Sequence, residues 1–428
     1  MTAPPPARGS AAASSWALAM LFITNVFNQG DRMLFGVVAE PIRKDIGLTD
    51  TQLALASGLF FVLFSLLGGI FIARLIDRGN RVRILAAGIA LWSLATAATG
   101  FAHDYLTLSM ARILVGIGEA TAFPVAMSLI PDLFSVRVRG RAVSIYQSSN
   151  FVGIVGGTIL AGVLAASMGW RSMFIVCGLA GVIVATVMVL TVTEPCREAA
   201  GDRQPVDAYW ADLASGFRRV LANSDVVVLS LGLGFATMMG AVLGAWGPAF
   251  LIRVHGVALG QVGLLIGPPV GLGGIIGTVA SGFMADMLVK RSGQPERMLV
   301  LSLFCVLLAL PFMAGFVFAA DLRLALVSAG AMNFFLSAVI PPITNYTINH
   351  VGPRDRGVAA TVLLIAMGLV GGALGPAIVG AISDGGQAAL RPDALRNGLA
   401  FMLLSPVAAG VLVLVALRAL HHNRTISD

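Results

Sequence analysis

QLALASGLFFVLFSLLGGIFIARLIDRGNRVR, residues 52–83, joins a long apolar run to a short charged loop. Its apolar part, residues 52–75, carries no charge before Arg74. A helix needs about 20 mostly apolar residues to cross the hydrocarbon core of a bilayer. The run is therefore long enough for one membrane span, and a short loop rich in charges follows it. The same alternation recurs along the chain and predicts an all-α polytopic membrane protein.

The composition supports this prediction. Of 428 residues, 57% are hydrophobic and 11% are charged, whereas about 25% of the residues of an ordinary soluble domain are charged. Most of the 50 glycines lie inside apolar runs, where transmembrane helices tolerate them. The three cysteines have no metal-ligand spacing. These features exclude a disulfide scaffold, an intrinsically disordered chain and a nucleic-acid-binding protein with a concentrated basic face.

Twelve apolar runs of sufficient length define the predicted spans: 16–38, 52–75, 83–101, 105–129, 140–166, 172–192, 226–250, 259–286, 298–319, 322–348, 358–382 and 397–418. The first run carries Asp31 and Arg32, so we expect a retained first span and no cleavable signal peptide. The predicted parts are a flexible N-terminus (1–15), an N-terminal six-helix bundle (16–192), a linker (193–225), a C-terminal six-helix bundle (226–418) and a tail (419–428).

The loop arginines and lysines predict the orientation. Fifteen of them lie on one side of the predicted spans and seven on the other. Because short cytoplasmic loops carry the excess of Lys and Arg, the first side is predicted to be cytoplasmic. An even number of spans places both termini on that side. The sequence therefore predicts an integral protein of the cell (inner) membrane with both termini in the cytoplasm.

The two halves of the sequence resemble each other at three places. Residues 73–77 (ARLID) correspond to 282–286 (GFMAD), residues 139–142 to 356–359, and residues 155–157 to 370–372, at offsets of 209, 217 and 215. Six spans separate matching positions, so the repeats are parallel. Parallel repeats are related by an axis along the membrane normal, and a binding site is expected near the midplane. The glycines at 153, 156 and 157 are expected to allow close helix packing.

Four strongly charged residues, Asp31, Arg32, Arg112 and Glu119, lie well inside predicted spans. We call them the charged cluster. A charge in mid-bilayer costs a few kcal/mol, so these groups should face one another or a water-filled cavity. Arg112 and Glu119 lie seven residues apart, on one helix face, and Asp31 matches the depth of Arg112. We expect Asp31 to pair with Arg112 and Arg32 to reach Glu119, with a local Asp31–Arg32 pair as the alternative.

The charged cluster suggests how a proton and an anion could be coupled. With both carboxylates ionised the cluster is neutral, and protonation of Asp31 or Glu119 makes it +1 and attractive to an anion. Burial favours the neutral form of a carboxylate whose cationic partner leaves. The competing interpretation is a buried salt-bridge network that only holds helices together, although such pairs seldom stabilise more than apolar packing. We therefore predict that Asp31 and Glu119 couple protons.

The sequence resembles the major facilitator superfamily over essentially its whole length. The loop at residues 77–83 (DRGNRVR) is similar to that superfamily's acidic-basic loop signature, and residues 282–286 with Lys290 and Arg291 repeat it more weakly. The resemblance implies two pseudo-symmetric six-helix bundles and alternating access. It also implies a cytoplasmic gate formed by acidic and basic residues near these loops. The predicted gate residues are Asp77, Arg78, Arg139, Asp286 and Arg356.

Two branches of that superfamily share the motif in the first span. Residues 28–32 (NQGDR) resemble the Asn-x-x-Asp-Arg signature of spinster-like transporters and of organic-anion symporters. Residues 112–120 (RILVGIGEA) and 128–134 (SLIPDLF) are more similar to bacterial spinster-like proteins, although Gln29 replaces their usual Tyr. The resemblance implicates the charged cluster in coupling and gating, and it adds Asn28. Animal relatives in that branch handle sphingosine-1-phosphate or lysophospholipids.

The second half has no matching charges within its spans. The resemblance implies that spans one, four, seven and ten line a central cavity, which gives five further candidates for substrate contact or gating: Met238, Met239, Trp246, Asn333 and Asn345. Ordinary packing is the competing interpretation for each of them, because Met readily fills irregular gaps. One charged wall that faces a mostly apolar wall would suit an amphipathic anion.

The predicted function is proton-coupled secondary transport of an amphipathic organic anion similar to a lysolipid or sphingosine-1-phosphate. The alternatives are a symporter of small organic or sugar acids and a non-transporting membrane sensor on the same scaffold. No nucleotide-binding loop or catalytic constellation is found, so an enzyme is not expected. The expected partners are the substrate and membrane lipid, with no nucleic acid, for a chain that acts as a monomer. No cofactor is expected besides the proton gradient.

Overall fold

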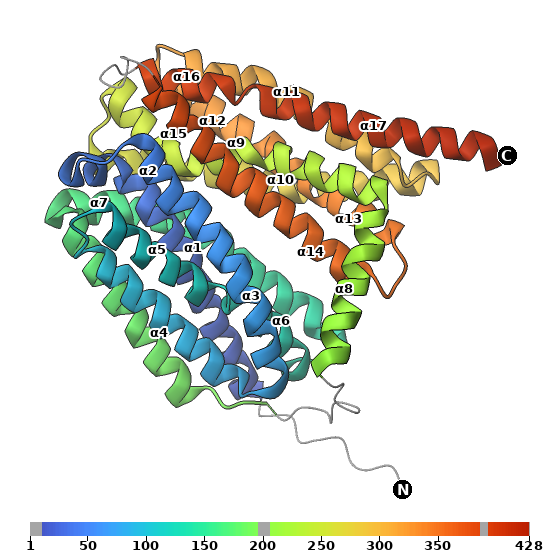
Figure 1. Cartoon of the computed structure of the whole chain (residues 1–428), viewed down its shortest axis with the longest axis horizontal. Helices are drawn as coiled ribbons and strands as arrows, with labels where there is room; N and C mark the ends of the chain where they lie inside the picture. The colour runs from blue at the N-terminus through green and yellow to red at the C-terminus, as the bar shows by residue number, and fades with distance from the viewer. Residues whose placement is uncertain (1–10, 196–205, 386–392, 428) are drawn as a thin grey trace, which may run out of the picture. The chain divides into compact units, whose positions relative to one another are not determined.

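The computed structural model describes residues 11–195, 206–385 and 393–427, and all elements in these ranges are helical (Figure 1). Side chains are described for the same residues except 77–78, 206–213, 393 and 421–427. Eleven helices in the described ranges are long and apolar enough to cross a membrane. One of them, α7 (Val136–Thr191), has 56 residues and is broken at Gly169, where φ is 81°. This helix contains the fifth and sixth predicted spans, so the twelve-span prediction is confirmed.

By its contacts the chain divides into two compact units, each described here by itself. Unit 1 comprises residues 1–48, 60–203 and 259–264. Its other helices are α1 (Ala11–Ile46), α3 (Phe61–Arg78), α4 (Arg81–Thr99), α5 (Tyr105–Glu119) and α6 (Ala122–Leu133). Helix α1 begins five residues before the predicted first span, so residues 11–15 are helical, and residues 1–10 of the predicted flexible N-terminus lie outside the described ranges.

Unit 2 comprises residues 49–59, 204–258 and 265–428. Its helices are α2 (Asp50–Ala54), the π-helical η1 (Leu55–Phe60), α8 (Val206–Ala222), α9 (Ser224–His255), α10 (Leu259–Ser292), α11 (Arg297–Phe318), α12 (Leu322–Ala338), α13 (Ile340–His350), α14 (Arg356–Ala366), the π-helical η2 (Met367–Leu374), α15 (Gly375–Asp384), α16 (Asp393–Phe401) and α17 (Leu404–Ser427). Helix α8 lies in the predicted linker, and α17 continues through the predicted tail.

The units differ from the predicted bundles at two short segments. Residues 49–59, from the second predicted span, group with unit 2, and residues 259–264, from the start of the eighth, group with unit 1. Residues 49–59 group with unit 2 because Asp50 contacts residues of α9 and α15. The grouping of residues 259–264 follows from close backbone packing, since a Cβ on Gly162 would lie 3.0 Å from the Leu259 carbonyl oxygen.

Helices α1 and α7 pack closely because small residues face each other. A Cβ on Gly157 would lie 2.5 Å from the Cα of Gly30, and a Cβ on Gly153 would lie 2.6 Å from the carbonyl oxygen of Val26. Small residues at such crossings let two backbones approach within a membrane, where van der Waals contact drives association. This crossing fixes the part of α1 that carries Asp31 and Arg32.

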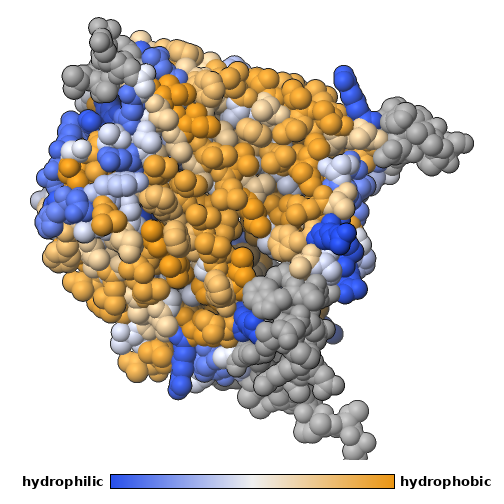
Figure 2. All heavy atoms as spheres, in the orientation of Figure 1, coloured by the Kyte–Doolittle hydropathy of each residue, from blue (hydrophilic) through white to orange (hydrophobic). Residues whose placement is uncertain are grey.

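Apolar side chains cover much of the surface. In Figure 2 they dominate the face in view, and hydrophilic side chains gather towards its margins. Among the described residues, Phe71, Leu190 and Phe283 are 68%, 77% and 74% exposed. A soluble protein seldom exposes so much contiguous apolar surface, whereas hydrocarbon chains of a bilayer accept it.

The fourth and tenth predicted spans are each built from two helices. Helix α5 ends at Glu119 and α6 begins at Ala122, while α12 ends at Ala338 and α13 begins at Ile340. These spans occupy equivalent places in the two sequence repeats. Discontinuous helices are typical of transporter binding sites, and the break in the fourth span directly follows a member of the charged cluster.

The glycine crossing of α1 and α7 yields a direct test of helix packing. Gly157→Ala should lower the free energy of unfolding by about 1–3 kcal/mol, because the new methyl group must push the helices apart. Gly156→Ala is the matched control, since a Cβ there meets nothing within 4 Å. Thermal unfolding in detergent measures both variants. Equal midpoints would show that close approach at Gly157 does not stabilise the fold.

Candidate functional site

The candidate site lies in unit 1, where α1, α4 and α5 bring the charged cluster together. The Arg32 Nε donates a hydrogen bond to Glu119 Oε2 at 2.7 Å. The Glu119 side chain is fully buried, whereas that of Arg32 is 41% exposed. This pair therefore has one member that solvent or a ligand can reach.

The second pair is looser and more deeply buried. The Arg112 Nη1 lies 3.7 Å from Asp31 Oδ2, and these side chains are 2% and 7% exposed. That distance is too long for a hydrogen bond. Instead, the Thr96 hydroxyl of α4 donates to Asp31 Oδ1 at 2.9 Å. The pairing of Asp31 with Arg112 and of Arg32 with Glu119 agrees with the prediction, and the roles of these residues in transport stay predictions.

Aromatic rings form the walls of the site. The guanidinium of Arg112 lies over the rings of Phe35 and Phe61, at 5.1 and 5.5 Å from their centroids, and that of Arg32 lies 5.2 Å from the Phe61 centroid. Cation–π contacts become stronger when water is excluded. Close packing positions Phe61, because a Cβ on Gly116 would lie 2.6 Å from its carbonyl oxygen.

Several polar atoms of this site are buried without a hydrogen-bond partner among the described residues. They are Asn28 Nδ2, Asp31 Oδ2, Arg112 Nε, Arg112 Nη1 and Glu119 Oε1. An unsatisfied buried polar atom costs about 1–3 kcal/mol, and more when it is charged. The arrangement therefore favours binding of a proton at the carboxylate oxygens or of an acceptor, such as an anion oxygen, at Arg112.

A second polar group lies beside the charged cluster, between α1 and α7. The amides of Asn25 and Gln29 donate to Asn150 Oδ1, both at 2.8 Å, and Asn25 also donates to the Ser149 hydroxyl at 2.7 Å. We call Asn25, Gln29 and Asn150 the amide cluster. Asn25, Gln29 and Arg32 follow one another at helical spacing, so the amide cluster continues the polar face of α1.

Three of the predicted substrate residues in unit 2 are explained by packing. Met238, Met239 and Trp246 are 3%, 0% and 2% exposed. The Trp246 indole donates to the Pro376 carbonyl at 3.1 Å, and Met238 packs where a Cβ on Gly375 would lie 2.6 Å from its Cγ. Within unit 2 these side chains belong to the core, which agrees with the competing interpretation.

The two predicted asparagines of unit 2 also have local partners. The Asn333 amide donates to the Val270 carbonyl at 2.7 Å. Asn345 accepts hydrogen bonds from the Asn349 amide one turn later. The roles of these two residues in substrate contact or gating stay predictions. The described residues contain no group of three or more His, Cys, Asp or Glu that could hold a metal.

In the loop signature of the first half, residues 77–83, Arg81 forms two ion pairs. This arginine is 2% exposed, and it binds Asp132 and Glu194 carboxylates at 2.6 Å each. It also donates to the Ser128 carbonyl at 2.9 Å, and Glu194 accepts a hydrogen bond from the backbone of Val82 at 2.9 Å. The chain end of the sixth span is thereby fastened to the start of the third.

The predicted gate residues themselves form few contacts. The side chains of Asp77 and Arg78 lie outside the described part of the structure. Arg139 donates to the Pro131 carbonyl at 3.1 Å. Asp286 and Arg356 are exposed, and no ion pair joins either to another described residue. Roles for these five residues in a gate stay predictions.

Beside the second loop motif, a different ion pair joins α8 to the start of α14. The Arg219 guanidinium binds the Asp355 carboxylate at 2.7 Å. Its hydrogen bonds hold the pKa of Asp355 below the usual range, so the carboxylate stays ionised at neutral pH. Val220 of α8 adds an apolar contact with a small core that contains Val226, Ala359 and Val362.

Unit 2 contains a further buried ion pair that involves the start of α2. Arg253 binds both Asp50 carboxylate oxygens at 2.7 Å, and the Ser383 hydroxyl donates to Asp50 at 2.6 Å. The Asp384 carboxylate accepts hydrogen bonds from the backbone of Asp50 and Thr51 at 3.0 and 2.7 Å. A carboxylate at a helix N-terminus accepts hydrogen bonds from free backbone N–H groups and interacts favourably with the positive end of the helix dipole. These contacts are the reason why residues 49–59 group with unit 2.

Sequence reasoning missed several of these residues. Thr96 is an ordinary polar residue of an apolar span, and no pattern marks it as the partner of Asp31. Glu194 lies in the predicted linker, and no sequence pattern marks it as a partner of Arg81. Asp50 and Asn150 lie far in sequence from their partners. The one usable signal was polarity inside a span, which applies to Thr96 and Asn150.

With this geometry in place, comparisons with known proteins identify the family. The Major Facilitator Superfamily model matches residues 21–376. The chain belongs to the major facilitator superfamily. A solved structure of a bacterial homologue of the human lysosomal transporter Spinster, in an inward-facing and unoccupied conformation, matches this major facilitator protein with a TM-score of 0.86 at 27% identity. That match covers 96% of this chain and 98% of the other.

Two relatives show the range of the family around this protein. It is 30% identical over 404 residues to an MFS-type efflux pump of Mycolicibacterium smegmatis, and the match covers 93% of this chain and 90% of that protein. It is 28% identical over 310 residues to a probable L-galactonate transporter of Escherichia coli, which covers 68% of this chain and 66% of that protein. The predictions of a major facilitator fold and a spinster-like transporter, rather than an enzyme, are confirmed.

The ion pair at Asp50 gives a second test of stability. Asp50→Asn should lower the free energy of unfolding by about 3 kcal/mol, because it leaves the Arg253 charge buried without compensation. The matched control is Asp45→Asn, which breaks a pair with Arg171 whose side chains are 47% and 33% exposed. That change should cost less than about 1 kcal/mol. Thermal unfolding in detergent compares them, and equal losses would contradict a stabilising role for the Asp50 contacts.

Proposed function

We propose that this major facilitator protein is a proton-coupled secondary transporter that moves an amphipathic organic anion, similar to a lysolipid or sphingosine-1-phosphate, by alternating access. One observation carries the proposal. Two buried carboxylates, Asp31 and Glu119, each lie beside an arginine of unit 1, and each retains an oxygen without a hydrogen-bond partner among the described residues.

The two ion pairs differ in geometry, which supports different roles for them in proton and anion binding. Arg32 and Glu119 are in direct hydrogen-bond contact at 2.7 Å, whereas Arg112 and Asp31 are 3.7 Å apart. A proton on Asp31 would cancel its charge and release Arg112 to bind an anion. Binding of the anion to Arg112 would in turn weaken the hold of that arginine on Asp31 and favour its protonation. Proton and anion binding therefore promote each other, as linkage requires.

The surroundings of the arginines support an amphipathic substrate. The rings of Phe35 and Phe61 lie against the guanidinium of Arg112, so the cationic centre is set in an apolar wall. A headgroup oxygen can bind the arginines while an acyl or alkyl chain contacts aromatic side chains. The likeness to a homologue of the lysosomal transporter Spinster, solved in an inward-facing conformation, supports transport by alternating access.

The amide cluster favours a second candidate function, the transport of small sugar acids. Amides of Asn25, Gln29 and Asn150 supply donors and acceptors suited to sugar hydroxyl groups. Asn25 and Gln29 lie on the same face of α1 as Arg32, and Asn150 belongs to α7. An acid bound through its carboxylate at an arginine could place its hydroxyl groups there. The relative described as a probable L-galactonate transporter supports this candidate.

We also propose the orientation that the loop charges predict. The protein lies in the cell (inner) membrane with both termini in the cytoplasm and acts as a monomer. On that basis the ion pairs of Arg81 with Asp132 and Glu194, and of Arg219 with Asp355, lie on the cytoplasmic side. They would hold cytoplasmic helix ends within their own units while the predicted gate opens and closes.

Reconstitution into liposomes with an imposed pH gradient tests the coupling. Lysolipids and sugar acids are screened, and wild type should accumulate one class. Asp31→Asn and Glu119→Gln should each reduce gradient-driven accumulation by about tenfold, because neither side chain then exchanges a proton. Exchange of labelled for unlabelled substrate at equal pH should be affected less, which separates loss of coupling from loss of folding.

Asp45→Asn serves as the matched control, because it removes an exposed carboxylate of unit 1 outside the site. It should leave accumulation unchanged. Wild-type accumulation by both Asp31→Asn and Glu119→Gln would refute proton coupling at these residues. Accumulation of sugar acids without lysolipids would establish the second candidate substrate class in place of the first.

A further inference from the structure

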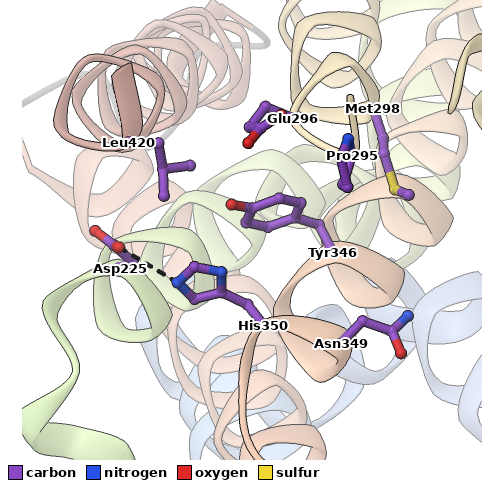
Figure 3. Close-up of a pocket in the computed structure, with 8 residues that line it drawn as sticks. All are labelled: Asp225, Pro295, Glu296, Met298, Tyr346, Asn349, His350 and Leu420. Atoms are coloured by element: carbon purple, nitrogen blue, oxygen red, sulfur yellow. Dashed lines mark ion pairs between the residues drawn. The ribbon is translucent and has the colours of Figure 1, made fainter. Parts of the chain in front are cut away.

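A cavity of about 380 Å³ lies in unit 2 (Figure 3). It is formed at the beginnings of α9 and α11 and towards the ends of α13 and α17. This volume lies within the range of small-molecule sites. The proposed transport mechanism does not use any of its side chains.

Two carboxylates line this cavity. Asp225 lies in the first turn of α9, and Glu296 directly precedes the first residue of α11. Helix N-termini interact favourably with carboxylates. His350 is the last residue of α13. No Lys or Arg side chain of the described residues lines the cavity.

Aromatic side chains form one wall of the cavity. The rings of Tyr346 and His350 stack with their centroids 5.3 Å apart at an angle of 20°. His350 Nε2 lies 3.6 Å from Asp225 Oδ2, which orients the imidazole. Figure 3 draws Tyr346 between Glu296 and His350, with its hydroxyl directed towards the side of Asp225. The acidic groups and the aromatic face therefore border the same hollow.

The rest of the lining is apolar and comes from Pro295, Met298 and Leu420. A bare metal ion would find too few ligands, since no group of three His, Cys, Asp or Glu occurs among the described residues. An organic cation fits better, because carboxylates and an aromatic ring bind its charge while apolar side chains contact its carbon atoms. We propose that this cavity binds a small protonated amine, of the size of ethanolamine.

The same ammonium chemistry has two sources. One is a free amine in solution, and the other is the headgroup of an aminophospholipid, because the cavity lies at the ends of membrane-crossing helices. Bound in either form, the amine links helix ends of unit 2 that are far apart in sequence. It should therefore stabilise the folded protein in proportion to its occupancy.

Thermal unfolding of the purified full-length protein in maltoside detergent tests the proposal. Ethanolamine hydrochloride is titrated at about pH 8, where a free imidazole is neutral, against sodium chloride at equal ionic strength. Ethanolamine should raise the unfolding midpoint in a saturable manner, and sodium should not. In the Asp225→Asn/Glu296→Gln double variant, the concentration needed for half of the shift should rise by about tenfold or more.

Each shift is measured against the same variant without amine, so a change in basal stability does not obscure the result. Asp321→Asn is the matched control, because Asn also caps the helix that Asp321 caps, α12. It should respond as wild type does. Absence of an amine-specific shift, or an equal shift in the double variant, would overturn the proposal.

Nanodiscs distinguish the two sources. In phosphatidylglycerol nanodiscs, added ethanolamine should raise the midpoint of the wild type. If an aminophospholipid occupies the cavity, addition of phosphatidylethanolamine to the bilayer should itself raise the midpoint and remove the effect of free ethanolamine. If the ligand is a free amine, the shift should be the same in both bilayers. A midpoint that responds to neither form would contradict amine binding.

Discussion

A charged side chain in the hydrocarbon of a bilayer costs a few kcal/mol unless it is paired or faces water. Four charged side chains lie inside the predicted spans of unit 1, and the fold meets their cost by pairing each carboxylate with an arginine. The compensation is incomplete, since both pairs retain polar atoms without partners among the described residues. A network that only held helices together would gain from satisfying these atoms, whereas a site that exchanges protons and anions needs them.

Close helix packing is what places those charges. Glycines at the crossing of α1 and α7, and Gly116 where α5 meets Phe61, allow backbones to approach where larger residues would clash. Arginines and aromatic rings are thereby held in contact. The break after Glu119 ends α5 at the site itself. Packing of small residues and placement of charge are thus two consequences of the same helix arrangement.

Much of this arrangement follows from patterns within single spans. The lengths of the apolar runs predict the number of membrane spans, and the heptad spacing of Arg112 and Glu119 predicts their common helix face. Contacts between distant segments leave no such pattern, so sequence could not predict that Thr96 binds Asp31 or that residues 49–59 group with unit 2. The candidates of the second half rest on span number and residue type. The structure places Trp246 in a core, and the roles of these residues in substrate contact or gating stay predictions.

We propose that anion binding and protonation of the charged cluster promote each other. Calorimetry of substrate binding in buffers with different ionisation enthalpies measures the protons taken up per anion bound, with the anion that proteoliposomes accumulate as the ligand. We expect the wild type to take up protons on anion binding near neutral pH, and the Asp31→Asn/Glu119→Gln variant to take up none. Equal uptake by both proteins, or none by the wild type, would contradict this proposal.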